Sequence, residues 1–491
     1  MCKCILKCLL LFSAPCFGNN LQISSVTHST VSGNHYLNFT ISWDNSWRVS
    51  SNPGNWDAVW VFVKRKDCAN LQWHHASLSS LSSDHSIGSP LQVDAYSDKK
   101  GVMLHRITDG SGNISMVNVQ IKLDAPPAGN YEYKVSGIEM VYINQGEFYL
   151  GDGASVFSFK KGNTNNPYLV TSEASIPFSS NGSDLWTIYP SQNTFTIRNL
   201  YPKGFNAFYC MKYEISQGQY SDFLNTITQD AFQNHYDATK VNDTRFTISG
   251  AWPLMTAAAP DRACNWISID DLTSYLDWSA LSPITELEFE KICRGNSINF
   301  PVANECAWGG NQITDANTIT PGTNGLPTET VDDVIATGTG LANYSNGGII
   351  GPLRCGFAAR SNATRFEAGA SYYGVMEMSG NVFELCFNAD SSTFGRSYLF
   401  NGSHGDGELS ITPFPGYSNQ NWPGQTPLDF TEQYFTFAIR GGAWSSPLNP
   451  TATQLSISDR TFPIISIGAG LPNPDGKGRS SAFGGRGVSR R

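Results

Sequence analysis

The segment at residues 371–385 constrains the fold more than any other stretch, because two glycines interrupt an amphipathic run at fixed places. Gly374 and Gly380 predict positions where the backbone turns with positive φ or approaches another group closely. Glu377 and Glu384 stand on either side of the second turn. Carboxylates beside a tight turn with free carbonyls suit a hard cation such as Ca²⁺. The alternative is a buried turn whose glutamates meet arginine or backbone N–H groups, and composition alone favours that alternative.

The overall composition narrows the class of protein. A chain of 491 residues exceeds one ordinary core and predicts two or more domains. Charged residues make up 15%, aromatic residues 12%, and there are 46 glycines, which indicates a loop-rich, β-rich extracellular protein. The net charge of −9 is spread without long runs, and this argues against a nucleic-acid partner.

Residues 1–18 have the features of a secretory signal peptide. Lys3 and Lys7 precede a short apolar run that ends in small residues, and the run is too short to span a bilayer. No later segment is apolar enough for a membrane-spanning helix. We therefore expect a secreted chain, extracellular or at the cell surface, cleaved after Gly18. A periplasmic location and a lipid anchor at Cys16 remain open.

Cysteine usage gives no sign of a zinc site. Seven cysteines follow residue 18, so at least one thiol is free if the others pair. Their spacings are long, and no Cys-x-x-Cys occurs. Buried, unpaired cysteines are the ordinary alternative to disulfides.

Residues 19–135 predict an all-β domain. Strands are expected at residues 37–43, 58–64 and 117–123, with turn signals between them. This pattern suggests an immunoglobulin-like sandwich. Four tryptophans are expected in its core rather than in a sugar-stacking patch: Trp43, Trp47, Trp56 and Trp60.

Three helices are predicted further along the chain by capping residues spaced three apart. The pairs are Ser216 with Gln219, Ser268 with Asp271, and Thr285 with Glu288.

The third helix carries three glutamates, Glu286, Glu288 and Glu290, that cannot share one helical face. We therefore expect structural ion pairs, for example with Arg294, rather than an acid–base pair. From residue 295 to 370 helix signals vanish, and residues 152–197 look like a surface insertion.

Several segments, in order, resemble the formylglycine-generating (sulfatase-modifying factor) family. They are residues 138–151, 283–295, 374–384, 438–444 and 484–488. The resemblance implies an α+β fold, a loop-rich C-type-lectin-like domain at residues 136–491 that follows the β-sandwich at residues 19–135.

The resemblance also implies structural Ca²⁺. One site would use Glu377, Glu384 and the carbonyls of Gly380 and Val382. A second segment is similar to the family's other calcium segment. There Asn343 would supply a side-chain oxygen and Tyr344 a carbonyl, but the aspartate that the family places farther on is not evident.

The same resemblance predicts that the family's chemistry is absent. Family enzymes hold Cu(I) with two cysteines after an Arg-Gly-Gly-Ser motif, and this soft ion requires sulfur. Here those positions are Ser446 and Thr451, Ala443 replaces the motif serine, and no cysteine follows Cys386. The family's structural disulfide also lacks its second cysteine.

Histidine gives no stronger metal signal. Iron-using proteins of the same fold need a histidine cluster, and no His-x-x-x-His-x-Glu run occurs among the eight histidines. His404 beside Asp406 could bind a metal, but a lone histidine in a glycine-rich loop is usually solvated.

We therefore expect a secreted, non-catalytic binding or structural protein, a pseudoenzyme at the cell surface or in an extracellular assembly. Its ligand would be a protein or a glycan that contacts residues 444–475, and self-assembly remains open. The alternative is a metal-dependent oxidoreductase of the same superfamily with a different cofactor site.

Overall fold

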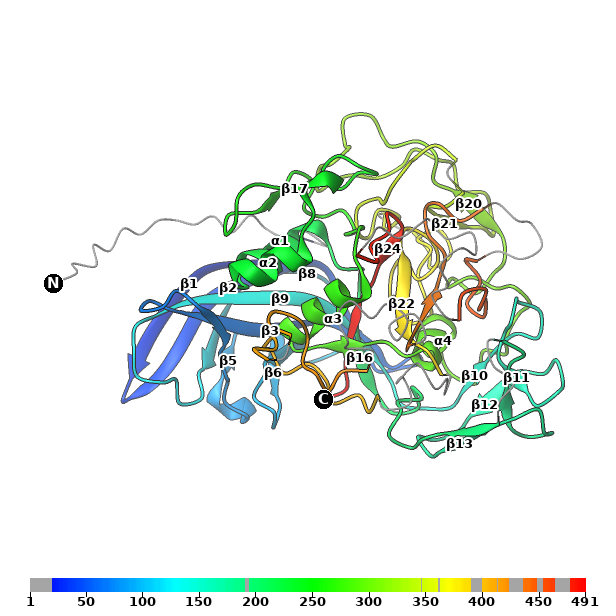
Figure 1. Ribbon diagram of the computed structural model, residues 1–491, viewed down its shortest axis with the longest axis horizontal. Coiled ribbons are helices and arrows are strands. Elements are labelled where there is room, and N and C mark those ends of the chain that lie inside the picture. The colour runs from blue at the N-terminus through cyan, green and yellow to red at the C-terminus, as the bar shows by residue number, and fades with distance from the viewer. Residues whose placement is uncertain are drawn as a thin grey trace.

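The computed structural model describes residues 20–189, 194–345, 347–360, 363–389, 400–412, 414–423, 436–447, 454–463 and 477–491. The predicted signal peptide lies outside these residues. The described chain is mostly β-structure with few helices and many loops. Figure 1 shows long strands on one side and a loop-rich half on the other.

A twelve-stranded sheet dominates the first half of the chain. Its main path runs in the order β19-β25-β16-β9-β3-β2-β8-β5, with β1, β4, β6 and β7 pairing alongside. The strands are β1 (Gln22–Val31), β2 (Asn34–Val49), β3 (Asn55–Asp67), β4 (Trp73–His75), β5 (Ser86–Ile87), β6 (Leu91–Ala95), β7 (Val102–Arg106), β8 (Gly110–Lys122), β9 (Tyr131–Ile143), β16 (Phe208–Met211), β19 (Ser282–Pro283) and β25 (Gly487–Ser489).

Strand β9 connects the two halves of the chain. It pairs antiparallel with β3 from Asp57↔Val141 to Asp67↔Tyr131, and its end, Met140 to Ile143, pairs with β16. The boundary expected between residues 135 and 136 therefore falls inside one continuous strand, so the two halves share a sheet.

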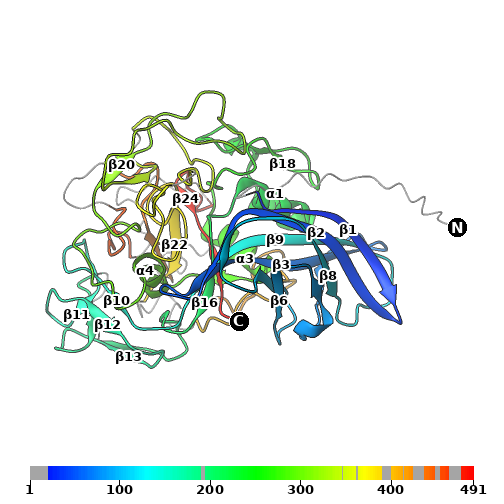
Figure 2. The same ribbon diagram turned by 180° about the vertical axis from the view of Figure 1, so that it is seen from behind.

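Strand β3 is covered on both faces, because successive side chains point to opposite sides of a strand. Val59, Val61 and Val63 join a core built with residues of β2, β7 and β8. Trp60 and Phe62 join a second core that includes helix residues. This explains the nearly continuous apolar run at residues 58–64. Figure 2, from behind, shows β1 and β2 lying across β3 and β9.

The tryptophan prediction is confirmed for Trp43, which lies in the core built by β2, β3, β7 and β8, whereas the other three tryptophans lie in or against cores shared with the second half of the chain. Trp43 and Trp60 are fully buried, and Trp47 and Trp56 are partly buried against the cores. A sugar-stacking patch made of these four rings is excluded by their burial.

The three predicted helix starts are confirmed, each with both hydrogen bonds of a capping box. The α-helices of the described residues are α1 (Gln217–Asn225), α2 (Gln229–His235), α3 (Ile269–Trp278) and α4 (Glu286–Arg294). Short 3-10 turns are η1 (Ser82–Asp84) and η2 (Ala238–Lys240). No described helix is long and apolar enough to cross a membrane.

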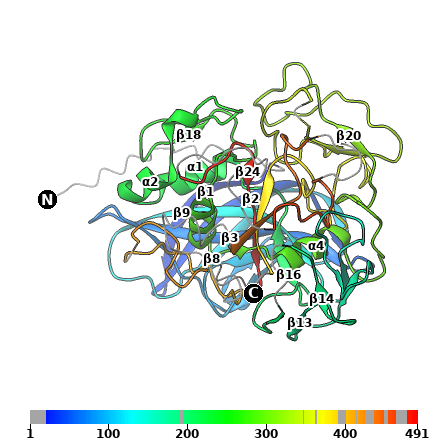
Figure 3. The same ribbon diagram turned by 45° about the vertical axis from the view of Figure 1, so that its right-hand side comes forward.

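Smaller sheets fill the loop-rich half (Figure 3). Their strands are β10 (Phe148–Leu150), β11 (Lys160–Lys161), β12 (Tyr168–Val170), β13 (Ile176–Phe178), β14 (Leu185–Trp186), β15 (Phe195–Ile197), β17 (Ile248–Ser249), β18 (Thr256–Ala257), β20 (Ile313–Asp315), β21 (Gly340–Ala342), β22 (Phe383–Phe387), β23 (Phe437–Arg440) and β24 (Phe483–Gly484). Among the described residues between α4 and β22 there is no α-helix, as predicted.

The segment at residues 152–197 is more than a surface loop. It forms the four-stranded sheet β11-β14-β13-β15, and Phe159, Phe178 and Trp186 are buried in the same core as the helices. The Ser/Asn/Gly-rich composition did not predict these buried aromatic residues, because they are widely spaced in the sequence.

Candidate functional site

The segment at residues 371–385 turns where its glycines predict. Gly374 has φ 87° and Gly380 has φ 99°. A Cβ at Gly380 would lie 2.8 Å from the Asn343 carbonyl oxygen, so the position requires glycine for both conformation and space. The chain then enters β22, which pairs antiparallel with β23 and parallel with β24. This pairing brings Glu384 beside Arg486.

Three buried glutamates and one buried arginine gather around this turn. Glu384 Oε1 accepts a hydrogen bond from Arg486 Nε at 2.6 Å. Glu377 Oε1 accepts one from the Gly356 N–H at 3.0 Å. Glu214, which the sequence reading missed, accepts from the Val382 N–H at 3.1 Å and from an amide side chain. Arginine and backbone partners for the glutamates are therefore present, as the alternative interpretation expects.

Burial makes the ionised forms of these three glutamates unfavourable. It raises the pKa of Glu214, of Glu384 and of Glu377, the last to about 7. The Arg486 guanidinium acts in the opposite direction on all three groups, but burial is the larger effect. Arg354 also acts on Glu377, so three carboxyls face two guanidinium groups and need a proton or a further cation to be neutral.

The two predicted calcium segments lie together. The Asn381 N–H donates to the Asn343 carbonyl at 2.8 Å, and the Asn343 amide donates to the Gly351 carbonyl at 3.1 Å. The Tyr344 N–H faces Asp315 Oδ1 at 3.4 Å. Asp315 is an aspartate before this segment in the chain, whereas the family pattern directed attention to the residues after it.

Several oxygens here suit a hard cation. Asn343 Oδ1, Glu377 Oε2 and Glu384 Oε2 are buried and have no hydrogen-bond partner among the described residues. Asn343 and Glu377 line the same narrow space, which is too tight to admit a water molecule. No group of three or more His, Cys, Asp or Glu side chains in the described chain is arranged around a metal position. A cation would therefore need amide or carbonyl oxygens as well, which is compatible with Ca²⁺.

Gly380 and Val382 contribute backbone in this region. The Gly380 N–H donates to the Gly441 carbonyl at 2.8 Å, and the Val382 N–H is taken by Glu214. Both residues thus fix the turn through their N–H groups, and a ligand role for their carbonyls stays a prediction.

Ser446, which the family resemblance assigns to the first of the two thiol positions, carries a hydrogen-bonded hydroxyl. Ser446 is buried, and its Oγ accepts from the Ala443 N–H at 3.0 Å and donates to Gln454 Oε1 at 2.7 Å. The Ser446 carbonyl accepts from the Ser345 N–H at 2.9 Å. Thr451 and much of the predicted ligand-contacting segment at residues 444–475 lie outside the described residues.

The glutamates of α4 make structural ion pairs, as predicted. Arg440 on β23 bridges Glu286 at 2.9 Å and Glu290 at 3.0 Å. Glu290 also pairs with Arg294 at 3.0 Å, and Glu288 pairs with a C-terminal arginine. All of these carboxylates are buried, and their ion pairs join α4 to β23 and to the C-terminal segment.

His404 is not solvated, in contrast to the expectation for its loop. It is buried, and its ring packs near Phe400 and Trp422. Burial lowers its pKa to about 4, so the ring is neutral at physiological pH. The Asp406 carboxylate accepts a hydrogen bond from the Glu408 N–H at 2.9 Å.

Sequence reasoning missed Glu214 and the partnership of Glu384 with Arg486. Glu214 lies three residues after the end of β16 and two residues before the capping serine of α1. Its charge, close after that of Lys212 in an otherwise apolar run, was the available signal.

The described chain combines a β-rich, loop-dominated fold with a turn at Gly380 whose next residue, Asn381, donates to the Asn343 carbonyl. The sulfatase-modifying factor enzyme 1-like domain matches residues 130–461, which is more than half of the chain. The chain therefore belongs to this family, as the sequence motifs indicated. The match begins at the start of β9. No curated protein sequence matches the chain.

Proposed function

We propose that this chain is a secreted, non-catalytic member of the family that acts as a binding or structural protein outside the cell. The observation that carries the proposal is Ser446, a buried hydroxyl at the position of the first copper-binding thiol. A hydroxyl does not replace a thiolate as a ligand of Cu(I).

The other cysteines offer no substitute. Six of the seven described cysteines are buried, and burial raises the pKa of each of these six thiols. Thiols held in the protonated form are poor metal ligands and poor nucleophiles. Cys68 is exposed, but it lies between β3 and β4 in the β-rich half.

We further propose that Ca²⁺ stabilises the loop-rich half. The unpartnered oxygens of Asn343 and Glu377, which line one narrow space, support this, because a cation between them would satisfy both and offset the excess of buried carboxyls, among them Glu384. The immunoglobulin-like topology of residues 19–135 and the location outside the cell belong to the same proposal.

A peptide-oxidation assay tests the proposal that the chain does not carry out the copper-dependent oxidation of a peptide cysteine. Purified protein loaded with Cu(I) is incubated in air with a cysteine-containing sulfatase peptide, and no aldehyde should form. A Ser446→Cys/Thr451→Cys variant restores two sulfurs and should bind Cu(I) more tightly than the natural chain. Aldehyde formation by the natural chain, or equal copper binding by both proteins, would remove the proposal.

Chelation tests the calcium part. Adding EDTA should lower the thermal midpoint by about 5 °C or more, and Ca²⁺ should restore it. Asn343→Ala should reduce the difference, whereas Asn311→Ala, at an exposed asparagine, should not. An unchanged midpoint in EDTA would contradict a calcium site.

A further inference from the structure

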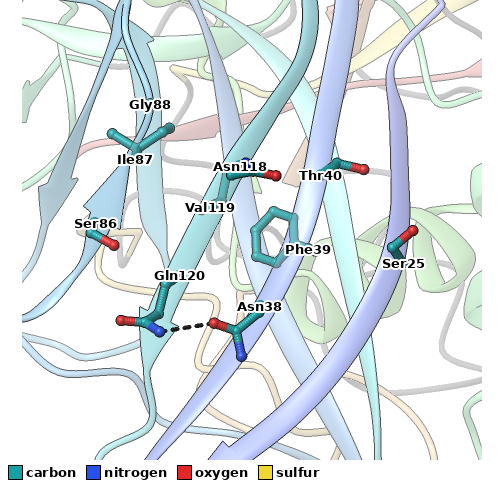
Figure 4. Close-up of a pocket in the computed structure, with 10 residues that line it drawn as sticks. All are labelled: Ser25, Asn38, Phe39, Thr40, Ser86, Ile87, Gly88, Asn118, Val119 and Gln120. Atoms are coloured by element: carbon teal, nitrogen blue, oxygen red, sulfur yellow. Dashed lines mark hydrogen bonds between the residues drawn. The ribbon is translucent and has the colours of Figure 1, made fainter.

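A cleft lies on the outer face of the first sheet, far in sequence from the thiol positions. It has a volume of about 430 Å³ and crosses β1, β2, β8 and β5 (Figure 4). This volume falls within the range of about 300–1,000 Å³ that is typical of small-ligand sites. Six polar side chains line it: Ser25, Asn38, Thr40, Ser86, Asn118 and Gln120.

The strand pattern explains how the cleft forms. Phe39 and Val119 contribute to its lining, but their side chains are buried in the core behind it. Their neighbours Asn38, Thr40, Asn118 and Gln120 therefore project to the opposite face, because side chains alternate along a strand.

On both sides of the cleft, the backbone departs from the regular sheet and stands above the floor of the cleft. On one side, the register of β1 shifts between Ser24 and Thr27, and Ser25 has φ 56°. Bulges of this kind bend a strand and are frequent beside binding sites. On the other side, the Gly88 N–H donates to the Asn118 carbonyl and brings the β5 segment close to β8. An otherwise flat sheet face is thus hollowed.

The lining is polar but carries no charge. None of the ten residues around the cleft is acidic or basic. Toward one end of β8, Lys122 and Asp84 pair with each other at 3.1 Å. A phosphate or a nucleic acid would need free cations here, and a metal would need carboxylates.

The amide groups are arranged as a donor–acceptor row. Gln120 Nε2 donates to Asn38 Oδ1 at 2.8 Å, and Asn38 Nδ2 donates to Ser29 Oγ at 3.0 Å. Each carboxamide still has donor and acceptor capacity beyond these bonds. Asn118 is exposed beside them. Groups that donate and accept at once match sugar hydroxyls, which do the same.

A peptide fits this surface less well. Strand addition requires a sheet edge with open backbone groups. The cleft instead lies between β1 and β5, the outer strands, and each of them uses the edge that faces the cleft to pair with β2 or β8, which also pair with each other. A ligand there meets side-chain amides and hydroxyls rather than a backbone ladder. We infer that this cleft binds a neutral oligosaccharide.

Binding of the purified full chain to immobilised neutral oligosaccharides tests the inference. The probes are short gluco-, manno-, xylo- and galacto-oligosaccharides. At least one should bind, and an Asn118→Ala/Gln120→Ala variant should lose at least about tenfold in affinity for it. Ser115→Ala, at an exposed serine on the same strand but outside the cleft, is the matched control and should bind normally.

Asn118→Asp provides a second variant with nearly the same shape. It replaces an amide donor with a charge and should weaken binding without altering the thermal midpoint. The inference is overturned if no probe binds, if binding survives both cleft variants, or if the surface captures peptides instead of sugars. These outcomes leave the copper and calcium tests unaffected, so the two proposals fail separately.

Discussion

Arg486 partly compensates the negative charge of the buried glutamates Glu214, Glu377 and Glu384. It is fully buried, donates to Glu384 through Nε, and reaches the Met211 and Lys212 carbonyls through Nη1 at 3.3 Å. Its charge also favours the ionised forms of Glu214 and Glu377. A single guanidinium therefore joins β16, β22 and the C-terminal segment.

Replacing Arg486 with methionine should cost about 3–5 kcal/mol of folding free energy, because a buried carboxylate loses its partner. Urea denaturation measures the change. Lys99→Met removes a half-exposed ion pair with Asp124 and should cost less than about 1 kcal/mol. A similar small loss for Arg486→Met would show that the cluster is neutralised in another way.

Lys64 is a buried amine with an unusual titration. Its Nζ donates to the Gly407 carbonyl at 2.6 Å and lies 5.1 Å from the Trp278 ring centroid. Burial lowers its pKa to about 7, although Glu408, Asp277 and Asp406 oppose the shift and Lys100 adds to it. The unfolded chain therefore holds the proton to higher pH than the folded chain.

Between about pH 7 and pH 10 the unfolded state binds more protons at Lys64, so this residue makes the unfolding free energy rise with pH. The slope for one proton is at most about 1.4 kcal/mol per pH unit. Lys64→Met should remove that contribution, which denaturant titrations at several pH values can measure. Lys66→Met, on the same strand but less buried, should keep the slope. Parallel curves for the natural chain and Lys64→Met would contradict the shifted pKa.

Among the elements, the helices depend on their first residues. Ser268 accepts from the Asp271 N–H at 3.1 Å while the Asp271 carboxylate accepts from the Ser268 N–H at 2.9 Å. These bonds satisfy two of the N–H groups that a helix start leaves open. The same arrangement begins α1 and α4.

Ser268→Ala should therefore lower the unfolding free energy by about 1 kcal/mol, and by no more than about 2. The comparison is Ser221→Ala in α1, whose hydroxyl donates back to the Gln217 carbonyl inside the helix. Such a bond adds little stability, so this change should be nearly neutral. Equal losses in urea denaturation would argue against a specific capping effect.

The capping boxes show which parts of the fold the sequence determines locally. Ser216, Ser268 and Thr285 act within three residues, so their spacing alone predicts the helix starts. The same holds for Gly374 and Gly380, whose positive φ depends on the local turn. Contacts between distant segments were not predictable in this way. Glu384 contacts Arg486 only because β22 pairs with β24, and the spacing of residues along the sequence does not predict that register.

The residues of the candidate site also fall into two groups, those predictable from the local sequence and those brought in by tertiary packing. Glu377 was found through the glycine-flanked turn and Asn343 through a family motif, and both line one narrow space. Glu214 and Asp315 come from other segments and enter through tertiary packing. The cleft across β1, β2, β8 and β5 had no motif at all, because it arises from a bulge and from the register of four strands.

At the scale of the whole molecule, the two halves share interior as well as strands. Trp60 on β3 donates to the Ser279 carbonyl at 2.9 Å, and Asn55 donates to the Tyr373 carbonyl at 2.7 Å. Trp60 also lies in one hydrophobic core with residues of α1 and α3. Separating the halves would expose this core and leave β9 without β3.

We therefore expect the chain to unfold as one cooperative unit. A fragment of residues 136–491 lacks β3 and the first part of β9, so it should not fold, since unpaired strand edges and an open core are unfavourable. Calorimetry of the full chain should show one transition, and circular dichroism of the fragment should show little ordered structure. A longer fragment that begins at residue 130 restores β9 but not β3, and it should fail for the same reason. Two separate transitions, or a folded fragment from residue 136, would mean that the shared strand is only a contact between independent domains.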